Sequence, residues 1–150
     1  MIEIYTDGGC WGNPGPGGWA YIGEFDGERF QASGSDLATT NNKMELTAVI
    51  FALEYVFDVL NADKQKVRIH TDSQYVQKGI TQWIDNWIKR GWKTAAKKPV
   101  KNSDLWKRLL VLREKGDVVF TWVKGHAGNQ LNEACDRLVQ EAIQSISEKK

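Results

Sequence analysis

The sequence contains little cysteine and little histidine, two residues of each among 150. Cys10 and Cys135 form no spacing typical of a metal site. The opening Met-Ile-Glu-Ile lacks the basic segment, apolar core and cleavage site of an export signal. Both cysteines are therefore interpreted as free thiols of a protein that is not exported.

Long apolar runs are also missing. The most apolar stretch, Leu46 to Leu60, is too short to cross a bilayer and is interrupted by Glu54 and Asp58. The sequence contains no internal repeat, low-complexity segment or internal linker. We therefore expect one monomeric, cytoplasmic domain over residues 1–150, with no membrane partner and a frayed tail at 147–150. An opening Met and an end just beyond the last predicted helix favour a stand-alone protein.

The chain lacks a strong net charge, since its formal charge is only +1. This average hides a division, because the stretch from Trp83 to Lys101 carries six basic residues and one acid, Asp85. Its local charge of +5 leaves −4 for the rest of the chain. The pattern predicts a basic patch on a mildly acidic body.

Apolar and β-branched runs predict five strands, at residues 2–7, 18–25, 28–33, 67–72 and 118–123. Helical spacing predicts helices at 43–60, 73–79 and 105–112, and a last helix after the Gly-rich loop 125–129. That helix is expected to bury Leu131, Cys135, Leu138, Val139, Ala142 and Ile146. A meander followed by alternating helices and strands predicts an α/β fold with a mixed sheet.

The segment from Thr6 to Trp19, TDGGCWGNPGPGGW, is rich in glycine and could suggest a phosphate-binding loop. It contains neither G-x-x-x-x-G-K-S/T nor G-x-G-x-x-G, and no helix pattern follows it. A hairpin connection explains the glycines. It leaves Asp7 without a role.

Two acids, Asp7 and Asp72, each end an apolar predicted strand. Ligands bind at the carboxyl edge of sheets with parallel strands, so neighbouring strands would bring the two carboxylates together. Asp72 could instead cap the helix that follows it.

Glu45 allows two interpretations. With Asn42 as N-cap it fits a capping box, in which its side chain reaches back to the start of the helix. It also shares a helix face with Ala48, Val49 and Ala52, so its carboxylate would lie on an otherwise apolar side. The sequence alone leaves both open.

Asp136 and His126 complete the candidates. Taken alone, Asp136 is an ordinary solvated helix acid. His126 lies between glycines, where it could move and exchange a proton near neutral pH. Four carboxylates at one place would repel one another unless a cation neutralised them, and oxygen ligands favour Mg²⁺ or Mn²⁺. Two such ions suit phosphoryl transfer, so a phosphodiester is the expected substrate.

The basic stretch interleaves tryptophans with cations, which is typical of nucleic-acid contact. A partly buried tryptophan cluster under a solvated charge run is the alternative. The residues that would contact nucleic acid are Trp83, Trp87, Lys89, Arg90, Lys93, Lys97 and Lys98.

The sequence resembles ribonuclease H of the first type over nearly its whole length. The resemblance rests on five segments in family order: YTDGGCWGNPGPGGWA, TTNNKMEL, HTDSQYV, KRGWKTAAKKPVKNSDLW and WVKGHAGNQLNEACD. It implies a five-stranded mixed sheet flanked by helices, with strands 1 to 3 antiparallel and strands 4 and 5 parallel to strand 1. It also implies that residues 83–101 form a basic protrusion that holds DNA.

The resemblance assigns roles to single residues. Metal-binding carboxylates fall on Asp7, Glu45, Asp72 and Asp136, and the mobile histidine on His126. Contacts in the hybrid minor groove fall on Cys10, Asn13, Asn41, Asn42 and Gln74, and a DNA-phosphate contact on Thr40. If Glu45 binds metal, Thr40 or Asn41 would cap the helix instead. Asp85 and Ile88 stand where relatives often carry basic residues, which implies a weaker grip on DNA.

The activity that the resemblance implies is metal-dependent hydrolysis of the RNA strand of an RNA:DNA hybrid, leaving 3′-hydroxyl and 5′-phosphate ends. Two Mg²⁺ ions would take part, or Mn²⁺ in their place. The glycines around Asp7 would let the nucleic acid approach the carboxylate closely. A catalytically silent hybrid-binding module is the alternative, although it would not need four acids and a histidine.

Overall fold

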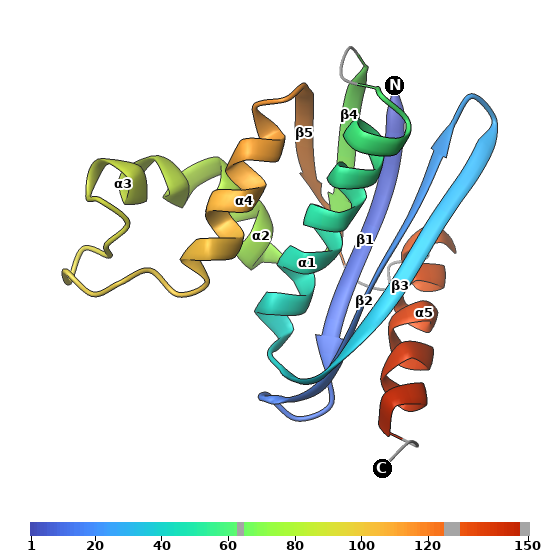
Figure 1. Ribbon diagram of the computed structural model, residues 1–150, viewed down its shortest axis with the longest axis horizontal. Coiled ribbons are helices and arrows are strands. Elements are labelled where there is room, and N and C mark those ends of the chain that lie inside the picture. The colour runs from blue at the N-terminus through green and yellow to red at the C-terminus, as the bar shows by residue number, and fades with distance from the viewer. Residues whose placement is uncertain (63–64, 125–129, 148–150) are drawn as a thin grey trace.

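The computed structural model describes residues 1–62, 65–124 and 130–147. Five strands form one sheet in the order β3-β2-β1-β4-β5 (Figure 1). Their bounds are Ile2–Cys10 (β1), Gly15–Phe25 (β2), Glu28–Thr39 (β3), Lys66–Thr71 (β4) and Asp117–Trp122 (β5). The first three strands pair antiparallel, and β1, β4 and β5 pair parallel. The predicted fold class and strand directions are confirmed.

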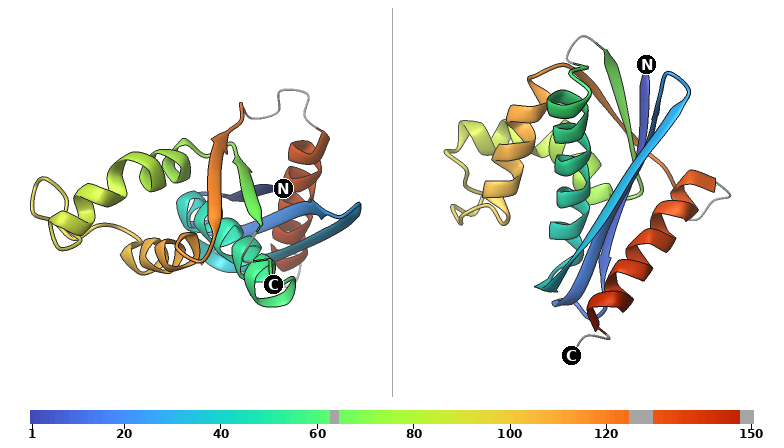
Figure 2. Two further views of the ribbon diagram at one scale, coloured as in Figure 1. Left: turned by 90° about the horizontal axis from the view of Figure 1, so that it is seen from above. Right: turned by 45° about the vertical axis from the view of Figure 1, so that its right-hand side comes forward.

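The helices divide between the two faces of the sheet. They are α1 (Asn41–Glu54), α2 (Gln74–Lys78), α3 (Ile84–Lys89), α4 (Ser103–Arg113) and α5 (Gln130–Ser147). Figure 2 shows α1 and α5 on opposite sides of the sheet. Wider π-helical turns at Tyr55–Val59 and Gly79–Trp83 extend α1 and join α2 to α3. None of the helices in the described ranges is both long and apolar enough to cross a membrane.

The main core lies between the sheet and α1. Ile2 and Ile4 of β1 face it with no exposed surface, and Leu46, Leu53 and Trp106 are equally buried. Apolar residues on several sides of α1 predicted a helix enclosed by its neighbours, and this is confirmed. Burial of this apolar surface holds α1 against β1, the strand that carries Asp7.

The inner face of α5 differs from the prediction. Cys135 and Val139 are buried as expected, but their buried partners are Asn132 and Ile143. The other four residues predicted for that face are only half-buried: Leu131, Leu138, Ala142 and Ile146. The predicted face consisted of apolar residues and did not include Asn132, and the buried face that the structure shows is rotated from it.

The glycine-rich segments belong to strands, which extends β1 and β2 beyond their predicted ends. Gly9 pairs with Gly18, and Cys10 with Gly17. A Cβ on Gly8 would lie 2.6 Å from the Met44 carbonyl oxygen, so β1 and α1 approach too closely for any side chain there. At Gly8 the absence of a side chain therefore serves internal packing, and the interpretation as space for nucleic acid is wrong there.

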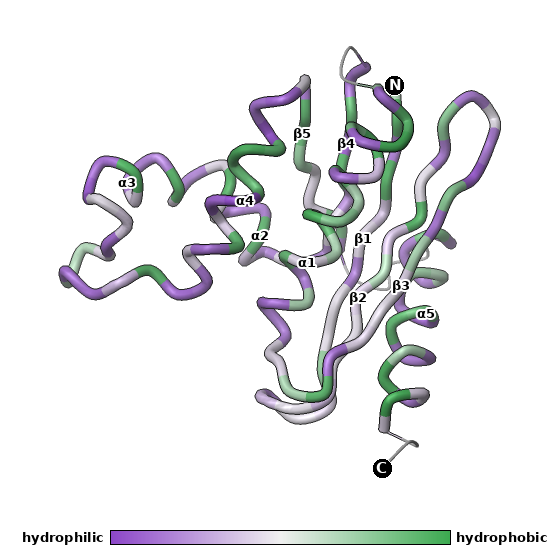
Figure 3. Tube along the Cα trace, viewed as in Figure 1, coloured by the Kyte–Doolittle hydropathy of each residue, from purple (hydrophilic) through white to green (hydrophobic). Residues whose placement is uncertain are grey.

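The segment after α3 extends away from the sheet (Figure 1). A single antiparallel bridge, Lys93 to Pro99, closes it. Figure 3 shows mostly hydrophilic colouring between α3 and α4. This segment and α3 correspond to the predicted protrusion at 83–101. At the other end of the chain, Ser147 is the last residue of α5, and the rest of the predicted tail lies outside the described residues.

Candidate active site

Three carboxylates from distant parts of the chain meet beside the central strand. Asp7 lies within β1, Glu45 on α1, and Asp72 directly after β4. Each offers an oxygen, and these oxygens all lie within 4.8 Å of one another. Asp7 and Glu45 are buried, with 6% and 7% of their surface exposed, and Asp72 is half-buried. The parallel pairing of β1 with β4 brings Asp7 and Asp72 together, as the sequence predicted.

Thr40, and not Asn42, caps α1. Its Oγ1 accepts a hydrogen bond from the Lys43 N–H at 3.3 Å. Asn42 is the second residue of the helix, so the capping box is wrong and Glu45 is free for another role. The Glu45 carboxylate reaches across to β1, where its Oε1 accepts the Gly8 N–H at 2.9 Å. The bare main chain at Gly8 makes this contact possible.

Asp136 of α5 lines the same cleft from the other side of β1. The cleft has a volume of about 390 Å³. Its lining residues are Asp7, Gly8, Gly9, Asn41, Asn42, Glu45, Asp72, Ser73, Asp136, Val139 and Gln140. All four predicted carboxylates therefore face one open cavity, although only three of them form the tight cluster.

Burial and mutual repulsion raise the pKa values of this cluster. Burial raises the pKa of Asp7 to about 7, and the charges of Asp72 and Asp136 add to it. The pKa of Glu45 lies well above its usual value because of burial and the charges of Asp7 and Asp72. Burial also raises the pKa of the Cys135 thiol, beneath the cluster, to about 12. The cluster therefore needs a proton or a cation between its oxygens.

The donors present fit a hard divalent cation. Within the described part of the chain, the buried Oε2 of Glu45 has no hydrogen-bond partner. Such an orphaned oxygen is costly unless something binds it. The ligand atoms are carboxylate oxygens, which suit Mg²⁺ or Mn²⁺ better than zinc. Cys135 is not available as a ligand, since its Sγ donates to the Tyr5 carbonyl at 3.2 Å.

Several of the predicted nucleic-acid contacts form one hydrogen-bonded group at the mouth of the cleft. The Cys10 N–H donates to Asn41 Oδ1 at 2.8 Å, and the Asn41 N–H donates to Asn13 Oδ1 at 3.2 Å. Asn42 lines the cleft, and Gln74 is exposed at the start of α2. The turn between β1 and β2 is thereby fixed against the first turn of α1.

The tryptophans of the protrusion pack against one another and against the core at tilted or edge-on angles. Trp83 lies 6.0 Å from Trp87 between ring centroids, and Trp87 lies 5.3 Å from the buried Trp106. Trp83 remains 36% exposed, while Trp87 is half-buried. The predicted cations around them are all exposed and form no ion pair with any described residue: Lys89, Arg90, Lys93, Lys97 and Lys98. The tryptophans therefore have partly a structural role, and the cations around them are available to an anionic partner.

His126 lies outside the described residues. Sequence reasoning missed Gln140 and Ser73, which line the cleft. Gln140 stands four positions after Asp136, one helical turn away, and this spacing is the signal that could have identified it. Trp122 was also missed as a neighbour of the site, because only the fold places the end of β5 beside Asp72.

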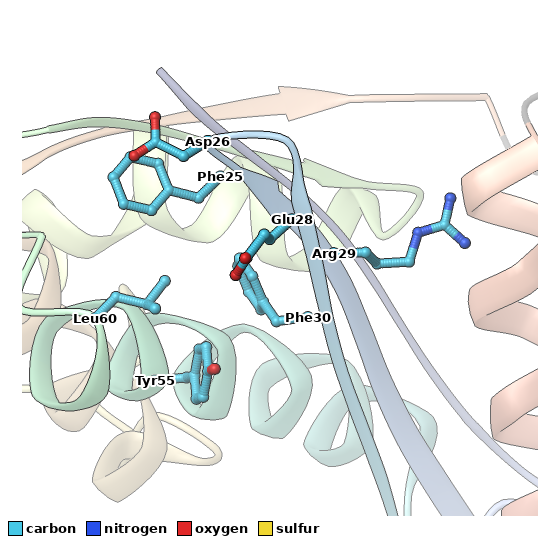
Figure 4. A pocket seen from close by; sticks show the side chains of 7 residues that line it. All are labelled: Phe25, Asp26, Glu28, Arg29, Phe30, Tyr55 and Leu60. Atoms are coloured by element: carbon cyan, nitrogen blue, oxygen red, sulfur yellow. The ribbon is translucent and has the colours of Figure 1, made fainter.

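A second pocket of about 380 Å³ lies at the β2–β3 hairpin. Figure 4 shows the rings of Phe25, Phe30 and Tyr55 along it, while Arg29 points away toward α5. It holds no cluster of metal-ligating groups among the described residues. The cleft with the four acids is therefore the candidate active site.

Comparison with known proteins identifies the family of this chain. The profile of the RNase H family, described as "RNase H", matches residues 1–144. A ribonuclease H of Nitrosomonas eutropha is 50% identical over 99% of this chain and 93% of its own length. One from Treponema denticola is 53% identical over 97% of this chain and 98% of its own.

Solved structures give the same result. LC9-RNase H1, a type 1 RNase H with the type 2 active-site motif, is 32% identical with a TM-score of 0.84 over 96% of this chain and 72% of its own. LC11-RNase H1, solved in complex with an RNA/DNA hybrid, is 25% identical with a TM-score of 0.75 over 97% of this chain and 99% of its own. Because the family model matches residues 1–144 and the two curated relatives share half or more of their aligned residues with it, the chain belongs to the ribonuclease H family.

Proposed function

We propose that this chain cuts the RNA strand of RNA:DNA hybrids by metal-dependent hydrolysis, leaving 3′-hydroxyl and 5′-phosphate ends. The observation that carries the proposal is the cluster of Asp7, Glu45 and Asp72 in an open cleft. Their carboxylates lie close together and partly buried, so a divalent cation would relieve the repulsion between their charges. Membership of the ribonuclease H family supports it. The chain of LC11-RNase H1, which matches this one over most of its length, was solved with an RNA/DNA hybrid.

Asp7, Glu45, Asp72 and Asp136 would hold the cations, two Mg²⁺ ions or Mn²⁺ in their place. Divalent cations in such a site supply an activated water and stabilise the charge on the departing 3′ oxygen. The residues of the chain fix where this happens. Gly8 holds Glu45 through its N–H, and the β1–β4 pairing holds Asp7 opposite Asp72.

Recognition of the hybrid would be shared between two surfaces. The group of Cys10, Asn13 and Asn41, with Asn42 and Gln74, would contact the minor groove near the cleft, where the 2′-hydroxyl distinguishes RNA from DNA. Thr40 and the cations of the protrusion would contact phosphates of the DNA strand. His126 would assist proton transfer or product departure. A monomeric state and a cytoplasmic location belong to the same proposal.

The test is replacement of Asp7 by Asn, with labelled hybrid, duplex RNA and duplex DNA as substrates, each with and without Mg²⁺. The wild type should cut only the hybrid, and only with Mg²⁺. Asp7→Asn should lose at least about a hundredfold in kcat, because it removes a charge aimed at the reacting centre. Hybrid binding should survive. Unchanged turnover in Asp7→Asn would refute the metal assignment.

A catalytically silent hybrid-binding module is the rival. It would bind labelled hybrid as tightly as a nuclease, but the RNA strand would stay intact at every Mg²⁺ and Mn²⁺ concentration. A radioactive label on the phosphate of the cleaved bond identifies the end chemistry. The label stays with the fragment on the 3′ side of the cut when the products are a 3′-hydroxyl and a 5′-phosphate.

A further inference from the structure

Trp122, the last residue of β5, makes an unusual contact beside the acidic cluster. Its indole Nε1–H donates to the main-chain carbonyl of Asp72 at 3.1 Å. The side chain nevertheless remains 42% exposed. Because much of the ring is exposed, the hydrophobic effect contributes little to holding it there, and the hydrogen bond is its distinctive contact.

The contact continues the pairing between β4 and β5 by one residue, at Asp72, where the chain leaves the sheet. The β4–β5 ladder ends with the pair Thr71 and Trp122. The Val123 N–H then donates to the Thr71 carbonyl at 2.8 Å. Asp72 is the first residue beyond the ladder, and the indole takes the place of the next strand partner for its carbonyl.

The chain on the other side of Asp72 is tied as well. The Ser73 N–H donates to Thr71 Oγ1 at 3.1 Å, and Ser73 Oγ caps α2 by accepting the Val76 N–H at 3.1 Å. The main chain at Asp72 is therefore held between the end of β4 and the start of α2. The indole hydrogen bond adds a contact from a side chain of another strand.

Repulsion makes such a tie useful. Asp7 and Glu45 are buried in the body of β1 and α1, whereas Asp72 is half-buried on a connection between elements. Of the three, Asp72 can relieve the repulsion most easily by moving outward. Each hydrogen bond to its main chain opposes that movement.

We propose that Trp122 is a positioning residue, whose indole N–H keeps Asp72 facing Asp7 and Glu45 so that the cluster is ready for a divalent cation. The inference rests on the proposed metal-dependent function. The exposed ring of Trp122 also suggests a different role, stacking on nucleic acid. The experiment separates the two.

The variants are Trp122→Phe, which keeps a ring but loses the N–H, and Trp122→Leu, which loses both. Mn²⁺ binding to the protein without nucleic acid is measured by calorimetry. Both variants should bind Mn²⁺ about three- to tenfold more weakly, the range expected from the loss of one hydrogen bond. The Mg²⁺ concentration for half-maximal cleavage should rise by a similar factor, while KM for the hybrid stays unchanged.

The matched control is Trp11→Phe. Trp11 is 45% exposed and its Nε1–H also donates, at 2.9 Å, but to the side chain of Gln140. This variant should bind Mn²⁺ as the wild type does. Melting temperatures of all variants show whether a change in metal affinity follows a general loss of stability, which would count against a positioning role.

Wild-type Mn²⁺ affinity in Trp122→Phe would overturn the inference. So would a raised KM for the hybrid in Trp122→Leu alone, because that result assigns the ring to stacking. If both variants bind Mn²⁺ more weakly but the wild-type protein itself cuts no hybrid, the positioning role is supported and the proposed function is refuted. Loss of cleavage in Asp7→Asn with an unaltered Trp122→Phe would refute only the positioning role.

Discussion

At the scale of single residues, the site is defined by carboxylates that are buried, where water screens their charges much less than at the surface. Asp7 has a carboxylate on a central strand, and Glu45 has one on a helix enclosed by the core. A carboxyl group whose pKa is raised in the folded state binds protons that the unfolded chain has released. This difference makes stability depend on pH.

We predict that the metal-free protein loses stability as pH rises from about 4 to about 7, the range between the usual value of 3.8 and the raised pKa of Asp7. The folded state binds more protons than the unfolded state in this range, so each step upward in pH favours unfolding. Urea unfolding in EDTA at pH 5 and pH 8 measures the loss. Mg²⁺ should restore much of the stability at pH 8.

Asp7→Asn should stabilise the metal-free protein at pH 8, by on the order of 2 kcal/mol, because it removes a buried charge from the cluster. It should also flatten the pH dependence. Asp117→Asn, at an exposed acid, is the control and should change little. An Asp7→Asn protein that is less stable than the wild type at pH 8 would contradict the idea of repulsion in the cluster.

At the scale of elements, the distance between β1 and α1 decides the geometry of the cluster. Gly8 lets the two backbones approach, and the same approach brings Glu45 to the Gly8 N–H. Strand and helix periodicity could not predict this distance, because it depends on which residues face each other across the core. Gly8 and Gly9 look alike in the sequence, but only at Gly8 would a side chain collide with the backbone of α1.

Gly8→Ala should therefore destabilise the fold by about 1–3 kcal/mol, the usual cost of forcing atoms into a packed interior. Gly9→Ala is the matched control, since its nearest neighbour would lie 3.8 Å away and its stability should change little. Urea unfolding of both variants gives the comparison. Equal stability of the two would show that β1 and α1 can separate without cost.

At the scale of the whole molecule, opposite charges occupy different places. The acids gather in the cleft beside β1, and the cations gather on the protrusion around α3. The protrusion extends away from the sheet (Figure 1). The net charge of +1 conceals this division. Such an arrangement suits one partner that reaches both places, with phosphates on the protrusion and its reacting bond at the cleft.

Replacing Lys89, Arg90 and Lys93 by Ala should weaken hybrid binding and lower its salt dependence. The slope of log K against log salt should fall by about one for each phosphate that the variant no longer neutralises. Binding is measured by fluorescence anisotropy in the Asp7→Asn background, so that the hybrid stays intact. The control is Lys115→Ala, whose ammonium pairs with Asp58 at 3.9 Å. An unchanged slope in the triple variant would exclude the protrusion as a phosphate-binding surface.

The sequence by itself determined the order and direction of the elements and the candidate acids. Apolar periodicity reports which faces are buried, and the alternation of helices and strands predicted a mixed sheet with parallel strands. The resemblance to ribonuclease H added that β4 and β5 run parallel to β1, which the strand pairing confirms. The ends of elements were less predictable. Glycines that suggested a loop continue β1, and Thr40 replaces Asn42 as the cap of α1.

The tertiary structure decided what each residue does. It decided that Thr40 and not Asn42 caps α1, as the resemblance had allowed, and it alone placed Gly8 against the α1 backbone and the Trp122 indole at the carbonyl of Asp72. The physical reason is the same in each case. A pattern along the chain reports the environment of one element, whereas repulsion, close approach and hydrogen bonding between elements depend on distances that exist only after they pack together.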